Sequence, residues 1–226
     1  MEIKKIRNRN VLFTYRQPAG WDLNVQLILG NRYNYIIDTG LGSLSMEPVK
    51  EYIKHDSKPI IVINTHYHWD HTWGNSSFRN CTIISHTSCR DMIDVHWEEM
   101  MQKYGHLVDG EAEKLLPDLT FEQEIYFPDD QIRIMYTPGH TADSISVMDE
   151  WEKVIHVGDN IGDSMEEPVP SLYGDKDDYI KTLLKYKKWI WNFACQGIIR
   201  LRKSKSLTKS WTSYKGARQH FNGSRH

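Results

Sequence analysis

The chain has 226 residues, of which 39% are hydrophobic and 26% charged, and its formal net charge is −2. This length favours one domain with a core that needs no disulfides, and the composition excludes a disordered, collagen-like or membrane-spanning chain, because no run approaches the roughly 18 apolar residues of a spanning helix. The first residues are charged and no continuous apolar segment follows them, so neither a secretory signal nor a membrane anchor is expected. Three cysteines are too few for a disulfide framework, and a cytoplasmic protein is therefore predicted.

Eight apolar, β-branched runs bounded by turn residues predict strands. They lie at 11–15, 24–29, 33–38, 60–64, 81–85, 131–136, 144–149 and 153–157. Short turns at Gly30-Asn31 and at 149–152 indicate that the second and third runs, and also the last two, form hairpins.

Three helices are expected between and after these strands. The first spans 45–55 with Ser45 as its N-cap, the second spans 88–104, and the third spans 176–193 behind the N-cap Asp175. The faces expected to be buried carry Met92, Val95, Met100 and Tyr104 in the second helix and Ile180, Leu183 and Leu184 in the third. Helices inserted between groups of antiparallel strands indicate the α+β class, with helices packed outside a sheet sandwich.

The charge is unevenly distributed along the chain. Residues 179–226 hold 12 of the 28 Lys and Arg residues and none of the 30 Asp and Glu residues. A basic end of this kind can contact nucleic acid or anionic lipid. No nucleic-acid-binding module accompanies it, so a nucleic-acid partner is disfavoured.

The densest chemical signal follows the predicted strand at 60–64, in the sequence Thr65-His66-Tyr67-His68-Trp69-Asp70-His71. Alternate residues that leave a strand point the same way, so His66 and His68 can converge on one ion while Asp70 and His71, beyond the turn, face a second. Imidazole nitrogen and carboxylate oxygen are ligands that zinc accepts. Burying these groups together without a metal would be costly, and the cluster is therefore interpreted as a metal site.

Three further segments show a similar pattern, in which a strand is followed by a polar residue with small residues beside it. They are Ile36-Ile37-Asp38-Thr39-Gly40, Thr137-Pro138-Gly139-His140-Thr141 and His156-Val157-Gly158-Asp159. Asp38 or Asp159 alone would be interpreted as a turn former, but beside the histidine cluster both become candidate site residues. His156 is expected to pack in the core. His86 is not expected to be a ligand, although it ends a strand as the ligands do. Two roles are open for Trp97, Met100, Met101 and Tyr104, either in the core or in a mobile apolar lid over the metals.

Together these motifs, HxHxDH at 66–71, TPGHT at 137–141, GD at 158–159 and DTG at 38–40, resemble those of the metallo-β-lactamase-fold hydrolase superfamily over roughly residues 11–193. The resemblance implies a four-layer αβ/βα sandwich with a dinuclear metal centre at one edge of its two sheets. It implies His66, His68 and His140 as ligands of the first metal, Asp70 and His71 as ligands of the second, and Asp159 as the bridge between them. Asp38 would orient a ligand imidazole.

The expected mechanism follows from the metals. Two divalent ions per subunit, with zinc expected and iron or manganese as alternatives, lower the pKa of a shared water, and one of them polarises the substrate carbonyl. Asp70 is expected to orient the resulting hydroxide and to pass its proton to the leaving group. The sequence has no GxSxG nucleophile motif.

The residue at position 159 narrows the substrate class. Aspartate there is typical of glyoxalase II and lactonase relatives, whereas many zinc β-lactamases of the family have cysteine, so small thioesters and lactones are the expected substrates. Only 48 residues follow Asp178, too few for the helical domain with which glyoxalase II binds glutathione. The alternatives are a β-lactamase-like amide hydrolase and a non-catalytic metal-binding protein with an incomplete second site. No membrane partner is expected, and the sequence does not indicate an oligomeric state.

The end of the chain departs from the family pattern, which places one more histidine for the second metal in a Pro-Gly-His context after the final strand. Here the sequence is Ala194-Cys195-Gln196-Gly197-Ile198. Read one nucleotide out of frame, codons for these residues can encode Leu-Pro-Gly-His. We therefore divide the chain into a hydrolase domain at 1–193 and an atypical basic tail at 194–226. We hypothesise that the tail comes from a frameshift, in the gene or in its sequencing, and that the second metal is weakly held.

Overall fold

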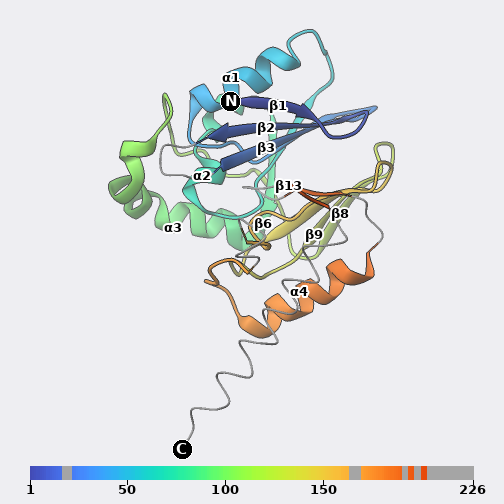
Figure 1. Ribbon diagram of the computed structural model, residues 1–226. Helices are drawn as coiled ribbons and strands as arrows, with labels where there is room; N and C mark the ends of the chain where they lie inside the picture. The colour runs from blue at the N-terminus through green and yellow to red at the C-terminus, as the bar shows by residue number, and fades with distance from the viewer. Residues whose placement is uncertain (17–21, 163–168, 190–192, 196–199, 203–226) are drawn as a thin grey trace, which may run out of the picture.

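The computed structural model describes residues 1–16, 22–162, 169–189, 193–195 and 200–202, which form two sheets with helices outside them (Figure 1). The first sheet has the strand order β1-β2-β3-β4-β5-β6-β7. Its strands are β1 (Glu2–Lys5), β2 (Asn10–Arg16), β3 (Asp22–Leu29), β4 (Asn34–Ile37), β5 (Ile60–Ile63), β6 (Thr82–His86) and β7 (Leu119–Phe121). The second has the order β13-β12-β11-β10-β9-β8. Its strands are β8 (Glu124–Phe127), β9 (Ile132–Tyr136), β10 (Ile145–Asp149), β11 (Val154–His156), β12 (Phe193–Cys195) and β13 (Arg200–Arg202).

The longer helices cover the outer faces of both sheets, and one short helix lies in the loop after β5. They are α1 (Ser43–Tyr52), α2 (Trp69–Thr72), α3 (Thr87–Tyr104) and α4 (Lys176–Lys188), and short 3-10 turns span Asn75–Phe78 and Gly105–Leu107. Figure 1 shows α4 on the outer side of the second sheet, with α1 and α3 on the side of the first. Of the helices formed by the described residues, none has both the length and the apolar character needed to cross a membrane.

Three layers of apolar packing separate these four structural layers. Met46 and Val49 of α1 pack on residues of the first sheet such as Val25 and Leu27. The sheets meet through a second cluster, in which Ile37 and Ile63 face Ile134, Ile145 and Val147. On the far side, Tyr179, Leu183 and Tyr186 of α4 pack on Met135, Met148 and Ile155. The alternation of inward and outward residues along β9 and β10 is what lets one strand serve two cores, and the αβ/βα sandwich expected from the sequence is confirmed.

The strand register brings four carboxyl ends to one edge of the sandwich. β4 and β5 are parallel, with Ile37 opposite Ile63, so the segments that follow both strands leave the sheet side by side. In the second sheet, β10 pairs antiparallel with both β9 and β11, and the two flanking strands therefore end at the same edge. The backbone NH of Ile145 donates to the carbonyl of Thr65 over 2.9 Å, which joins the sheets at this edge.

All eight predicted strands are present, and both predicted hairpins are confirmed as antiparallel pairs. Asp175 is the N-cap of α4, as expected, and accepts from the backbone NH groups of Asp177 and Asp178. The N-cap Ser45 was wrong, because the helix starts earlier, behind Gly42, and the Ser45 hydroxyl instead donates to Asp109 over 2.9 Å.

Two predicted buried faces need correction. In α3 the buried residues are Cys89, Ile93 and Trp97, and Val95 is 75% exposed. In α4 Leu183 is buried but Leu184 is exposed, because Tyr179 and Tyr186 occupy the face on the sheet. The helical spacing was right in both helices, and the error lay in the angular position of the face, which only the contacts with the sheet determine.

Candidate metal centre

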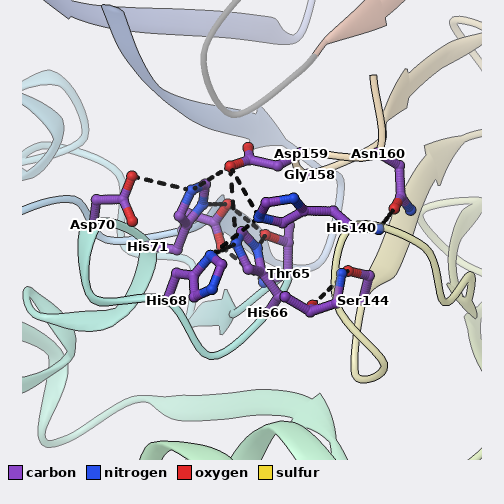
Figure 2. A network of polar contacts seen from close by, with 12 residues as sticks. Thr65, His66, His68, Asp70, His71, His140, Ser144, Gly158, Asp159 and Asn160 are labelled. Atoms are coloured by element: carbon purple, nitrogen blue, oxygen red, sulfur yellow. Dashed lines mark hydrogen bonds and ion pairs between the residues drawn. The ribbon is translucent and has the colours of Figure 1, made fainter. Parts of the chain in front are cut away.

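The four motifs found in the sequence meet where the strands end. Asp38 follows β4, the loop 65–71 follows β5, His140 follows β9, and Asp159 follows β11. Figure 2 shows the rings of His66, His68 and His140 turned toward one another below the carboxylate of Asp159. Residues separated by more than a hundred positions in the chain thus line a single site.

Three imidazoles form the first group. His68 Nδ1 lies 3.0 Å from His66 Nε2 and 3.1 Å from His140 Nε2. These three residues each offer one ligand atom, and the three atoms lie within 4.8 Å of one another. His66 is fully buried and His140 is 7% exposed, so the converging nitrogens lie at the bottom of the site.

The outer nitrogen of His66 is held by a relay that ends on Asp38. The Thr65 hydroxyl donates to Asp38 Oδ2 over 2.8 Å and lies 3.0 Å from His66 Nδ1. Since that hydroxyl gives its proton to the carboxylate, it accepts one from His66 Nδ1, which leaves the lone pair on Nε2 facing the site. The backbone NH of Thr65 also donates to Asp38, over 2.7 Å.

Asp38 fixes a second imidazole in the same way. Its Oδ2 lies 2.8 Å from His71 Nδ1, and both side chains are fully buried. A proton on His71 Nδ1 leaves Nε2 as the nitrogen that faces the site. Asp38 adopts a positive φ of 62°, a conformation that costs free energy in most residues and is found at functional sites.

His140 is held by partners that the sequence analysis missed. Its Nδ1 lies 2.6 Å from the carbonyl oxygen of Ser171, and its backbone NH donates to Asn160 Oδ1 over 2.8 Å. A Cβ at Gly139 would lie 2.4 Å from that same oxygen, so glycine is required there. Asn160 had a signal, since it follows Asp159 directly, whereas nothing in the sequence pointed to Ser171.

The second group combines His71 and Asp159 with His66. Asp159 Oδ2 lies 3.4 Å from His71 Nε2 and 3.9 Å from both His66 Nε2 and His140 Nε2. It therefore reaches both groups of histidines. Asp70 belongs to neither group, but its Oδ2 lies 3.6 Å from His71 Nε2, on the outer side of the second group (Figure 2).

Burial sets the charge of the first group. It lowers the pKa of His66 well below its usual value, and together with the neighbouring His140 it lowers the pKa of His68 to about 3. Both rings are therefore neutral near pH 7, the form of imidazole that binds a cation.

The second group is strongly polarised. Burial lowers the pKa of His71, but the carboxylates of Asp159, Asp70 and Asp38 outweigh it and raise that pKa well above its usual value. Burial raises the pKa of Asp70 to about 6, against the opposing effect of His71. Burial also acts to raise the pKa of Asp159, yet His71 holds it well below its usual range. The carboxylates thus favour a positive charge at the position of His71 Nε2.

These residues fit divalent cations. His71 Nε2 and Asp159 Oδ1 are buried, and neither has a hydrogen-bond partner among the described residues, an arrangement that is costly unless something else satisfies them. Imidazole nitrogens with carboxylate oxygens are a donor set suited to zinc, and imidazoles beside open carboxylates also suit iron and manganese.

Four of the candidate ligands, His68, Asp70, His140 and Asp159, line a pocket of about 450 Å³. Its walls come from the loop after β5, the last turns of α3 and the segment 169–173, and the side chains on them include Tyr67, Trp69, Met100, Tyr104 and Tyr173. Of the four residues with two open roles, Trp97 is 8% exposed and belongs to a core cluster, whereas Met100 and Tyr104 line this pocket.

His156 and His86, which were not expected to be ligands, lie outside both ligand groups. His156 is fully buried, and its Nδ1 accepts from the backbone NH of Gly158. His86 stacks on Tyr136 with 4.2 Å between ring centroids and accepts from the backbone NH of Ser88 at the start of α3.

The last histidine ligand of the second metal was expected in the segment that follows β12. β12 pairs in parallel with β11, with Cys195 opposite His156, so β12 ends at the same edge of the sheet as the strand that precedes Asp159. Residues 196–199 and 203–226, to which the frameshift hypothesis mainly applies, lie outside the described residues.

Comparison with known proteins agrees with this picture. The sequence profile of the Metallo-beta-lactamase superfamily matches residues 20–188. An atrochrysone carboxyl ACP thioesterase of Aspergillus chevalieri is 26% identical over 166 residues, which cover 71% of this chain and 48% of that protein. The human acyl-coenzyme A thioesterase is 26% identical over 192 residues, covering 73% of this chain and 67% of the relative. The chain thus spans about half the length of the fungal thioesterase. Among solved structures, a metallo-beta-lactamase from Pontibacter korlensis superimposes with a TM-score of 0.70 at 16% identity, covering 93% of this chain and 97% of the other, a likeness of fold alone.

Proposed function

The chain belongs to the metallo-β-lactamase superfamily, and from this premise we propose that it is a metal-dependent hydrolase that cleaves ester-like acyl carbonyls, either thioesters or lactones. The observation that carries the proposal is the convergence of His66, His68 and His140 beside an open pocket that His68, His140 and the buried, partly unpartnered Asp159 line. The similarity to two proteins named as thioesterases supports the thioester arm.

The residues divide into those that hold metal and those that position them. His66, His68 and His140 would hold one ion, His71 and Asp70 the other, and Asp159 would reach both. When bound, such ions lower the pKa of water and polarise a carbonyl. Asp38 keeps the lone pair of His71 Nε2 turned into the site, and through Thr65 it does the same for His66. Zinc as the metal and a cytoplasmic location are part of the same proposal.

Asp70 is the side chain best placed to move protons. Its carboxylate lines the pocket and lies 3.6 Å from His71 Nε2, without taking part in either converging group. We propose that it takes a proton from the attacking water and delivers it to the departing sulfur or oxygen. In thioester hydrolysis the water oxygen then bonds to the acyl carbon, the carbon–sulfur bond breaks, and the thiolate leaves as a thiol.

Metal analysis combined with a substrate panel tests this function. The zinc-reconstituted protein should hydrolyse simple acyl thioesters or lactones, and Asp70→Asn should reduce that turnover without reducing the content of the first metal. Turnover of β-lactams alone would favour the amide hydrolase. A protein that retains metal but hydrolyses none of these compounds would favour the non-catalytic alternative, which the sequence at 194–198, with no histidine, also suggests.

A further inference from the structure

One wall of the pocket is an aromatic stack that links the metal-binding loop to α3. Trp69 lies between the candidate ligands His68 and Asp70, and its ring stacks on Tyr104 with 4.8 Å between centroids and 17° between planes. Met100, one turn earlier on α3, lines the same pocket. A flat apolar wall of this kind suits an acyl chain or ring, whose burial against it is favourable.

A single lysine lies beside this wall. Lys103 lines the pocket, and its Nζ lies 4.9 Å from the centroid of the Tyr104 ring. No ion pair within the described part of the chain involves Lys103. A hydrogen bond with the Tyr104 side chain, and to a lesser extent the charge of Glu99 on the same helix, raises the pKa of Lys103. Glu99 also contacts His96, with 3.4 Å between Oε2 and Nδ1.

The apolar and the positively charged groups of this pocket lie on different parts of its lining. The candidate metal ligands form its floor, the aromatic stack forms a side, and Lys103 supplies the only lysine or arginine among its lining residues in the described structure. The lining carboxylates, Asp70 and Asp159, both belong to the floor. Residues 1–178 as a whole are acidic, so a general attraction of the domain surface for anions is not expected.

We propose that Lys103 is a specificity-determining residue that binds an anionic group of the substrate, while the Trp69–Tyr104 stack holds the apolar acyl part. The preferred substrates are then amphiphilic, anionic acyl thioesters. This inference rests on the proposed hydrolase function and adds the substrate class. The anion has two chemical sources, a phosphate on the leaving group or a carboxylate on the acyl group, and the experiment distinguishes them.

Binding of non-hydrolysable thioethers tests the proposal separately from catalysis. The three probes are S-hexyl-coenzyme A, with phosphates on the leaving side, S-(5-carboxypentyl)-N-acetylcysteamine, with a carboxylate on the acyl side, and the neutral S-hexyl-N-acetylcysteamine. Isothermal titration calorimetry on the zinc-reconstituted protein should show that Lys103→Gln lowers the affinity for one anionic probe about fivefold, as expected for an exposed charge pair. Binding of the neutral probe should be unchanged, and Lys103→Arg should retain the wild-type preference.

A lysine elsewhere provides the matched control. Lys181 on α4 is exposed, pairs with Asp178 and does not line the pocket, so Lys181→Gln should bind all three probes like the wild type. The proposal is overturned if Lys103→Gln binds both anionic probes as tightly as the wild type, if it weakens the neutral probe equally, or if the wild type binds no anionic probe better than the neutral one. A wild-type protein that hydrolyses neither thioesters nor lactones instead refutes the proposed function, whatever these affinities are, and one that hydrolyses lactones alone overturns the thioester substrate class.

Discussion

Replacing Asp38 by asparagine isolates the contribution of one buried carboxylate to both stability and metal binding. The carboxylate accepts three hydrogen bonds, from the backbone NH of Thr65 over 2.7 Å, from its hydroxyl over 2.8 Å and from His71 Nδ1 over 2.8 Å. Asparagine has nearly the same shape and also tolerates the positive φ at this position, so the backbone can stay in place. The change removes the charge and turns one accepting oxygen into a donating amide.

The magnitude follows from that count. Asp38→Asn keeps the acceptor for the Thr65 backbone NH but places an NH₂ group against the Thr65 hydroxyl and His71 Nδ1. Hydrogen bonds to a charged group contribute about 1.5–3 kcal/mol each, so losing two predicts a decrease of about 3 kcal/mol in the free energy of unfolding, after partial rotation of the hydroxyl. The same NH₂ group favours the His71 tautomer with its proton on Nε2, which should weaken second-metal binding about 10- to 100-fold.

Urea unfolding of the chelator-treated protein measures the first effect, and metal titration of the folded protein measures the second. Asp94→Asn is the control, since this carboxylate is exposed in its pair with Lys114 and should change stability by less than about 0.5 kcal/mol. The reasoning is refuted if Asp38→Asn retains both wild-type stability and wild-type affinity for the second metal.

Three further predictions concern the candidate ligands and the end of the chain. His140→Ala should remove one of three ligands of the first ion and so lower the metal content measured by elemental analysis, with the fold retained by circular dichroism; full metal content would contradict the assignment. Asp70→Asn should lower kcat for the best thioester or lactone by about 100-fold or more, and near-wild-type turnover would rule out its role in proton transfer. The triple change Cys195→Leu, Gln196→Pro, Ile198→His, which restores Leu-Pro-Gly-His around the existing Gly197, should tighten binding of the second metal in calorimetric titration. An unchanged second-metal affinity, or a nucleotide sequence whose shifted frame cannot encode Pro-Gly-His, would remove the frameshift hypothesis.

Much of the fold was predictable because the strands carry their own signal. The eight predicted strands all exist, since alternating or continuous β-branched runs are a local property of the chain. The strands that were missed, such as β7 and β8, are only three or four residues long, too short for an alternating pattern to be recognised. Their extended conformation depends on pairing with β6 and β9, which no local pattern reveals.

The sequence by itself indicated which residues belong to the candidate site. His66, His68, Asp70 and His71 lie within six residues of one another directly after a strand, so their spacing along the chain alone keeps them close together. Only the tertiary structure decided which groups hold them in place. Asp38 reaches His71 across 33 positions, because parallel pairing of β4 and β5 ends both strands at the same edge. The carbonyl of Ser171 reaches His140, and Tyr104 of α3 stacks on Trp69. Such contacts depend on how helices and sheets pack, and packing is set by the shapes of all the buried side chains together and by no single motif.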